Sequence, residues 1–410
     1  MSSTTATPAP AASTSTAPPV DDAPLPIPNL QLPQLAFNLS TPRPDSDDQH
    51  ARTALLDGIE HDRKSPFLLH MAPYLEHLAH AGLVTDQHDL LSRLKQLNTD
   101  ELKRINDKLD DATSNLGETE ISDALREKAT YLARIGEKDA AVKAHDEAFA
   151  KTAGKGSKID LVLSIVRIAL FHSDHDLVIS SLDRAQKLVD EGGDWDRRNR
   201  LKVYTGVHLL SIRNFNKAAD LLLDALPTFT ATELIPYDDF VTLCVLAGVF
   251  SLERKELRKK VIDAPEVIAV LPVVPSLKDF AESLWKCDYA AFFRALATVE
   301  EHHLLPSRLL AVHARYYARE LRIKAYAQLL ESYRSVTLES LAQAFGVSKE
   351  WLDADLARFI AAGRLPCTID RVASIVETHR PDAKNARYAA VIKQGDAVLT
   401  SVQRLSRVIG

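Results

Sequence analysis

The chain has 410 residues, of which 46% are hydrophobic and 26% are charged. Its 50 lysines and arginines and 56 aspartates and glutamates give a formal net charge of -6. This balance is ordinary for a globular protein, and it disfavours nucleic acid or an anionic membrane as the main partner.

The N-terminus lacks the apolar core of a signal peptide, and no apolar run reaches membrane-spanning length. The three cysteines, Cys244, Cys287 and Cys367, lie far apart and have no metal-ligand spacing. Buried thiols in a reducing compartment are therefore expected. These features together predict a protein of the cytoplasm and nucleus that has no membrane partner.

The composition and the spacing of apolar residues change twice within the first third of the chain. Residues 1–28 are rich in serine, threonine, alanine and proline, and a segment of this composition cannot bury enough apolar surface to become ordered. We expect a disordered tail there. Leucines alternate with polar residues from Asn29 to Ser40, which suggests an extended segment. Helical periodicity then follows, so residues 29–117 are predicted to combine an extended segment with helices.

Residues 118–300 contain a repeat of helical hairpins. Asp139 and Asp176 occupy matching turn positions 37 residues apart (176 − 139), close to the ~34-residue period of tetratricopeptide repeats. Such hairpins stack into a solenoid. The six predicted helices are Ala124–Ile135, Asp139–Ala150, Ile159–His172, Asp176–Val189, Arg197–Ile212 and Asn216–Leu226. The residues expected in its core include Val162, Ile165, Val166, Leu170, Val178 and Leu182.

Residues 301–381 have the pattern of a winged helix. A helix from Tyr316 to Tyr333 precedes a second from Leu338 to Phe345, capped by Thr337, and a third that Ser348 caps. Two short alternating segments then predict a β-hairpin. Because a short hairpin has an unpaired edge, we expect its strands to contact another subunit. The residues assigned to this interface are Leu365, Cys367, Thr368, Ile369, Val372, Ile375 and Val376.

The charges of the third helix help to distinguish a winged helix that binds nucleic acid from one that docks on protein. It carries Lys349 and Arg358 against Glu350, Asp353 and Asp355, so its face is slightly acidic. A helix that enters the major groove needs a basic face to meet phosphates. This pattern favours a protein-docking module over a nucleic-acid-binding protein.

Residues 382–410 are predicted to form a bundling helix. From Asn385 to Ile409, apolar residues recur at alternating steps of three and four, interrupted at Gly395. This is a heptad seam, which a single helix cannot bury by itself. The seam residues assigned to an interface are Tyr388, Val391, Val398, Val402, Leu405 and Ile409.

Four stretches carry a resemblance to a known family: Arg322–Tyr333, Arg358–Leu365, Ile375–Thr378 and Glu191–Tyr204. They resemble the non-ATPase regulatory subunit 6 family of the proteasome regulatory-particle lid. The resemblance implies a PCI domain, meaning helical repeats that end in a winged helix, and a non-catalytic scaffold for ubiquitin-dependent protein degradation. Its implied partners in a hetero-oligomeric complex are other PCI lid subunits, the small acidic lid protein and the ATPase ring. Lid subunits also join their C-terminal helices in one bundle.

Two alternatives remain open at this point: the equivalent subunit of the COP9 signalosome, and a nucleic-acid-binding winged-helix protein. No catalytic, cofactor or metal motif stands out. The chain has no H-E-x-x-H, no G-x-S-x-G and no phosphate loop of the required spacing. The sequence therefore predicts a mainly α protein, a tetratricopeptide-like solenoid followed by a winged helix and a C-terminal helix, without enzymatic activity.

Overall fold

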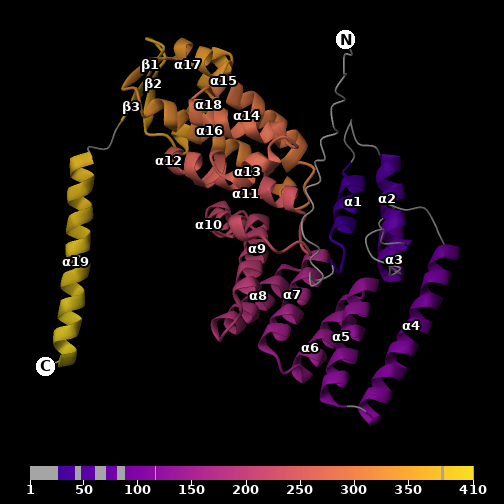
Figure 1. The fold of residues 1–410 in the computed structure, drawn as a ribbon. Helices are drawn as coiled ribbons and strands as arrows, with labels where there is room; N and C mark the ends of the chain where they lie inside the picture. Colours follow the sequence, from indigo (N-terminus) through magenta and orange to yellow (C-terminus); the bar gives the residue numbers. More distant parts are fainter. Residues whose placement is uncertain are drawn as a thin grey trace, which may run out of the picture.

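A computed structural model describes residues 26–41, 48–60, 71–80, 88–115, 117–379 and 383–409. These residues form a mainly helical molecule with one small sheet near the C-terminus (Figure 1). No helix within these ranges is both long and apolar enough to cross a bilayer. Most of the predicted disordered tail, residues 1–25, lies outside the described part of the chain.

The N-terminal part is helical from Gln31 onward. Its helices are α1 (Gln31–Ser40), α2 (Asp48–Glu60), α3 (Ala72–His80) and α4 (His88–Asn115). The prediction of an extended segment at 29–40 was therefore wrong. Leu32 and Ala36 of α1 are four residues apart and both buried, as expected for one helix face. Pro33 lies in the first turn, where its missing N–H removes no helical hydrogen bond.

Polar side chains attach this N-terminal part to distant segments. The buried guanidinium of Arg167 donates a hydrogen bond to the carbonyl of Ile27 (2.9 Å). The side-chain amide of Gln34 donates to the carbonyl of Pro306 (2.5 Å) and accepts from the backbone N–H of Arg308 (3.0 Å). Ile27 is buried although it belongs to the predicted tail, so the tail prediction extended too far.

The predicted helical hairpins are confirmed as α5 (Glu118–Ile135), α6 (Lys138–Lys151), α7 (Lys155–Phe171), α8 (His175–Asp190), α9 (Trp195–Ser211) and α10 (Phe215–Ala225). A residue with positive φ lies in the turn after the first helix of each hairpin. These residues are Gly136, Ser173 and Arg213. Asp174 and Asn214 then cap the second helices by accepting hydrogen bonds from backbone N–H groups. The repeat therefore consists of a shared turn geometry as well as a spacing.

The hairpins have a buried core. Most buried side chains of α7–α10 belong to one large hydrophobic cluster, whereas those of α5 and α6 belong to two smaller ones. The six side chains expected there, Val162, Ile165, Val166, Leu170, Val178 and Leu182, are all buried. Ser173 has a positive φ without being glycine, so the surrounding packing holds a turn that the residue itself disfavours.

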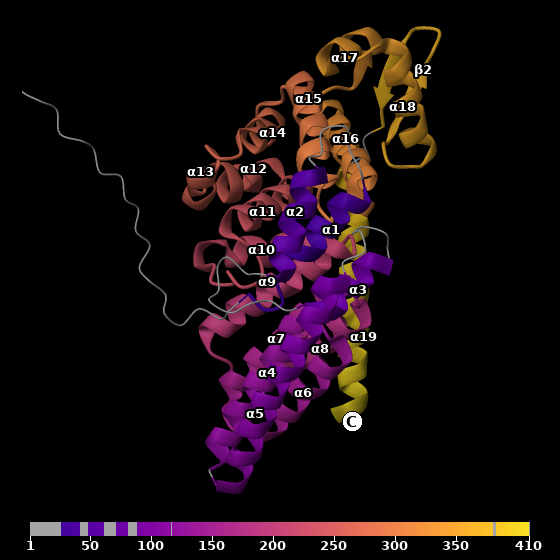
Figure 2. The ribbon, with the colours of Figure 1, turned by 90° about the vertical axis from the view of Figure 1, so that its right-hand side faces the viewer.

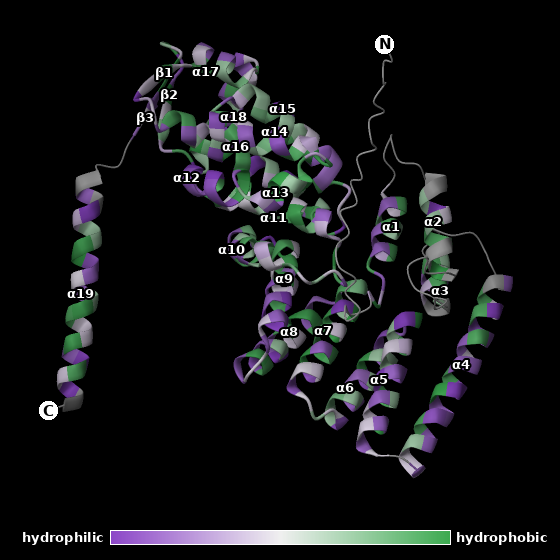
Figure 3. Ribbon diagram, in the orientation of Figure 1, coloured by the Kyte–Doolittle hydropathy of each residue, from purple (hydrophilic) through white to green (hydrophobic). Residues whose placement is uncertain are grey.

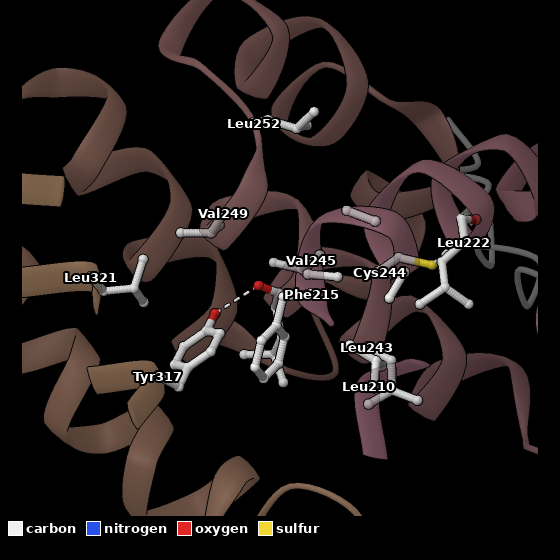
Figure 4. Close-up of a cluster of buried hydrophobic side chains, with 14 of the residues drawn as sticks. Leu210, Phe215, Leu222, Leu243, Cys244, Val245, Val249, Leu252, Tyr317 and Leu321 are labelled. Atoms are coloured by element: carbon white, nitrogen blue, oxygen red, sulfur yellow. Dashed lines mark hydrogen bonds between the residues drawn. The ribbon is translucent and has the colours of Figure 1, made fainter. Parts of the chain in front are cut away.

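The solenoid continues through α11 (Tyr237–Ser251), α12 (Arg254–Leu257), a π-helical turn (Arg258–Ile262), α13 (Pro265–Val270), α14 (Pro275–Lys286), α15 (Tyr289–Val299) and α16 (Ala314–Leu330). Tyr317 of α16 is fully buried against Phe215 and residues of α11 (Figure 4). Its hydroxyl donates to the carbonyl of Leu246 (2.7 Å), which satisfies its polar atom inside the core. Helix α16 is thereby anchored in the solenoid, and the chain continues from it into the predicted winged helix.

The predicted winged helix is present. It comprises β1 (Ser335–Thr337), α17 (Leu338–Phe345), α18 (Lys349–Ala361), β2 (Cys367–Asp370) and β3 (Ile375–Thr378). Thr337 and Ser348 cap the two helices through their hydroxyls, as expected. The sheet is antiparallel in the order β1-β3-β2, so the predicted hairpin gains a third strand that the sequence did not indicate.

Helix α19 (Ala383–Ile409) comes after the winged helix and stands apart from the body of the molecule in Figure 1. Apolar and polar bands alternate along α19 in Figure 3.

Figure 2 shows the stack of α4–α16 from the side. The predicted divisions of the chain near residues 117, 300 and 381 stay predictions.

Candidate interaction surfaces

The apolar seam of α19 has no covering within the described chain. Its side chains at Tyr388, Val391, Val398, Val402 and Leu405 are between 58% and 67% exposed. The side chain of Ile409, the last predicted seam residue, lies outside the described part. A row of large apolar side chains with this exposure is a candidate contact surface for another molecule.

The exposed apolar stripe is wider than the sequence predicted. Ile392 and Leu399 are 65% and 58% exposed, and each follows a seam residue by one position. They lie four residues after Tyr388 and Gly395, so they extend the same face. The signal was available, because an apolar residue beside the a/d seam distinguishes a multi-helix bundle from a two-stranded coil. The exposed apolar face of α19 therefore has the width that is typical of a helix in a multi-helix bundle.

The predicted interface residues of the winged helix fall into two groups. Leu365, Cys367 and Val376 are buried in the chain's own core, so their side chains stabilise the fold and are not available to a partner. This part of the prediction was wrong because one face of the sheet packs on the helices, and alternation places every second residue there. Thr368, Ile369, Val372 and Ile375 remain at least partly exposed.

The third strand changes which edge is free. The central strand is β3, so the sheet ends at β1 on one side and at β2 on the other. Val372, in the turn between β2 and β3, is 98% exposed. The contact of this edge and turn with another subunit stays a prediction.

Helix α18 has a neutral outer face. Asp355 is buried, accepts a hydrogen bond from the hydroxyl of Tyr326 (3.2 Å) and pairs with Arg322 (3.3 Å). The predicted acidic face therefore loses one carboxylate to the core, and two cations and two carboxylates remain. A neutral face still lacks the basic charge that binding in the major groove requires.

A basic surface lies at α12 and the π-helical turn. Five of the seven residues from Arg254 to Lys260 are cationic, and all five are exposed. The guanidinium of Arg258 lies 4.9 Å from the ring centroid of Trp285, and Arg254 donates to the Trp285 carbonyl (2.9 Å). Within the described ranges, Lys255 and Lys259 have no ion-pair partner. This surface suits an acidic protein segment.

Two kinds of reactive group can be located among the described residues: potential metal ligands and cysteine thiols. The described residues contain no group of three or more histidine, cysteine or acidic side chains that could hold a metal ion. The three cysteines are free. Burial raises the pKa of the Cys367 thiol to about 11 and that of Cys244 well above its usual value, so both are protonated at neutral pH.

Three family profiles match the chain. Residues 87–260 match the family described as 26S proteasome subunit RPN7, and residues 286–380 match the PCI domain. Residues 387–409 match the 26S proteasome regulatory subunit RPN7/PSMD6 C-terminal helix. The last profile coincides with the exposed part of α19.

Similar proteins cover nearly the whole chain. The 26S proteasome non-ATPase regulatory subunit 6 homolog of Arabidopsis thaliana is 45% identical over 93% of this chain and 97% of its own length. The 26S proteasome regulatory subunit RPN7 of Saccharomyces cerevisiae is 37% identical over 93% and 94%. COP9 signalosome complex subunit 1 of Arabidopsis thaliana is 27% identical over only 48% of this chain and 45% of its own length. The chain therefore belongs to the 26S proteasome non-ATPase regulatory subunit 6 (RPN7) family.

Proposed function

We propose that this chain is a non-catalytic structural subunit of the proteasome regulatory-particle lid, where it scaffolds lid assembly for ubiquitin-dependent protein degradation. The observation that carries the proposal is α19. Its apolar stripe is exposed over its described length, and it coincides with a C-terminal helix characteristic of the family. A helix of this kind is incomplete until other helices bury it.

The proposed partners are other PCI lid subunits, the small acidic lid protein and the ATPase ring. Contact with PCI subunits would use the α19 stripe and the outer part of the winged-helix sheet. That part comprises Thr368 and Ile369 of the edge strand β2, Val372 of the following turn, and Ile375 at the start of the central strand β3. The basic surface at Arg254–Lys260 supports an acidic partner. A lid subunit acts where proteasomes act, in the cytoplasm and the nucleus.

The two alternatives have weaker support. Similarity to the COP9 signalosome subunit is lower and covers half of the chain. A nucleic-acid-binding role lacks a basic recognition face, because the outer charges of α18 balance. Neither alternative accounts for a C-terminal helix that matches the proteasome family.

The proposal can be tested by expressing the tagged full-length chain in cells of the source organism. The chain is then purified through the tag, and the co-purifying proteins are identified by mass spectrometry. Proteasome lid subunits and peptidase subunits should co-purify with the chain in near-stoichiometric amounts. Cullin-ligase components in their place would support the signalosome alternative. Loss of all co-purifying protein with retained nucleic acid would support the nucleic-acid-binding alternative.

A further inference from the structure

Gly395 interrupts the seam of α19 at its centre. The seam residues on either side, Val391 and Val398, carry exposed branched side chains, whereas Gly395 carries none. It lies in the interior of a 27-residue helix. Glycine is among the least favourable residues in a helix interior, because it loses the most backbone freedom when the helix forms.

Nothing within the described chain requires a glycine at this position. A Cβ atom added to Gly395 would meet no heavy atom within 4 Å. Its φ is not positive, in contrast to Gly136, Gly346 and Gly363. Neither crowding nor backbone conformation in this chain therefore accounts for a residue that weakens the helix.

Larger side chains surround Gly395, so the absence of a side chain there leaves a hole in the apolar surface of α19. In helix packing of the knobs-into-holes type, a side chain of one helix inserts between four residues of the next. With Val391, Ile392, Val398 and Leu399 around it, Gly395 leaves an apolar depression in an otherwise continuous stripe. A depression of this kind accepts a larger side chain and lets the facing helix approach closely.

The charges of α19 restrict the partner further. From Asn385 to Arg407 the helix carries four cations and one carboxylate, Asp396, and all five are exposed. The cations are Arg387, Lys393, Arg404 and Arg407. A neighbour with acidic residues beside its apolar face complements this excess, whereas a second copy of α19 would be repelled.

We propose that Gly395 is a specificity notch, which receives a large apolar side chain from an acidic-flanked helix of another subunit in the bundle. This inference rests on the proposed function, because it needs α19 to enter a bundle. It adds that the facing helix must present a large apolar side chain opposite Gly395. It also explains why the seam has no side chain of its own at that position.

The test is co-expression of the full-length chain with the remaining lid subunits, followed by measurement of the fraction of the chain in the lid by native mass spectrometry. Gly395→Leu fills the notch and should lower incorporation more than tenfold, although leucine favours the helix. Thr400→Leu adds similar bulk on the opposite side of the helix and should incorporate normally. Gly395→Ala should give an intermediate loss.

A second variant separates this inference from the proposed function. The double change Val402→Asp and Leu405→Asp places charges in the seam, so it should abolish incorporation if α19 is an interface at all. If the double variant fails while Gly395→Leu incorporates as well as the unchanged chain, the notch is wrong and the bundle stands. If both incorporate normally, the notch and the bundle are both wrong.

Discussion

The amine nitrogen of Lys324, on α16, lies 2.6 Å from the carbonyl oxygen of Val249 in the last turn of α11. The same group donates to the carbonyls of Phe250 (3.0 Å) and Leu252 (2.6 Å). The last carbonyls of a helix have no intrahelical partner and carry partial negative charge. Lys324 therefore caps the C-terminus of α11. It thereby joins α11 to α16, the helix that leads into the winged helix.

Replacing this lysine should destabilise the junction. In Lys324→Met the three carbonyls lose a partly buried donor, and we expect the free energy of unfolding to fall by roughly 2–3 kcal/mol. Urea denaturation followed by circular dichroism measures this change. Lys217→Met, at an exposed site on α10, is the matched control and should change stability little. Equal stability of the two variants would show that Lys324 does not hold the junction.

The solenoid core gives a second prediction. Leu170 is 6% exposed and lies in the main hydrophobic cluster, so Leu170→Ala should cost about 2–5 kcal/mol through lost burial and a cavity. Thermal and urea unfolding provide the measurement. Ile179→Ala, at a side chain that is 47% exposed, should cost far less. A Leu170→Ala protein that unfolds like the unchanged chain would mean that the buried face has been misassigned.

The winged-helix edge can be tested by removing a backbone donor. Ile369 lies opposite Val376 as a non-hydrogen-bonded pair, so its N–H points to the free edge of β2, and proline at this position removes that donor. Ile369→Pro should reduce lid assembly and leave the helical circular dichroism signal of the solenoid unchanged. Ala354→Ser, at an exposed site on α18 outside the proposed contact, should have no effect. Normal assembly of Ile369→Pro would show that the sheet is not an interface.

His208 gives a pH dependence. Its side chain is buried, both ring nitrogens lack a hydrogen-bond partner among the described residues, and its ring lies 6.1 Å from that of His175. Burial, and then the nearby His175, lower the pKa of His208 below 6.5. Below pH 6.5 the unfolded chain therefore binds a proton that the folded chain does not, and the free energy of unfolding falls as the pH drops.

Unfolding of the His208→Leu variant between pH 7.5 and pH 5 measures this contribution. The variant should lose stability less steeply with acid, by at most about 1.4 kcal/mol per pH unit. His302→Leu is a control in which a different histidine is removed. An unchanged slope for His208→Leu would mean that His208 titrates alike in the folded and unfolded states.

Local signals explain what the sequence predicted well. The hairpins of the solenoid and the helices of the winged helix follow from apolar spacing and from caps such as Thr337 and Ser348, which depend on neighbouring residues only. The seam of α19 was visible for the same reason. Because the apolar stripe of α19 stays exposed, the spacing of its apolar residues is enough to predict it, and no knowledge of the tertiary fold is needed.

Long-range pairing explains what was missed. Strand β1 has three residues, and its partner β3 begins about forty residues later, so no local pattern marks it. Arg308 donates to the carbonyl of Leu170 (2.7 Å) across 138 positions, and Arg167 reaches Ile27 across 140. The burial of Leu365, Cys367 and Val376 likewise depends on which sheet face meets the helices, and alternation alone does not decide that.

The proposed function depends most on α19 being an interface rather than part of this chain's own core. The most direct measurement compares the full-length chain with one truncated after Lys384, for solution mass, helicity and incorporation into the lid on co-expression with the other lid subunits. The truncated chain should be a soluble, helical monomer that does not enter the lid, because the removed helix contributes no buried side chain to the core of the described residues. A truncated chain that unfolds, or one that enters the lid at the level of the full-length chain, would contradict the assignment of α19 as an interface.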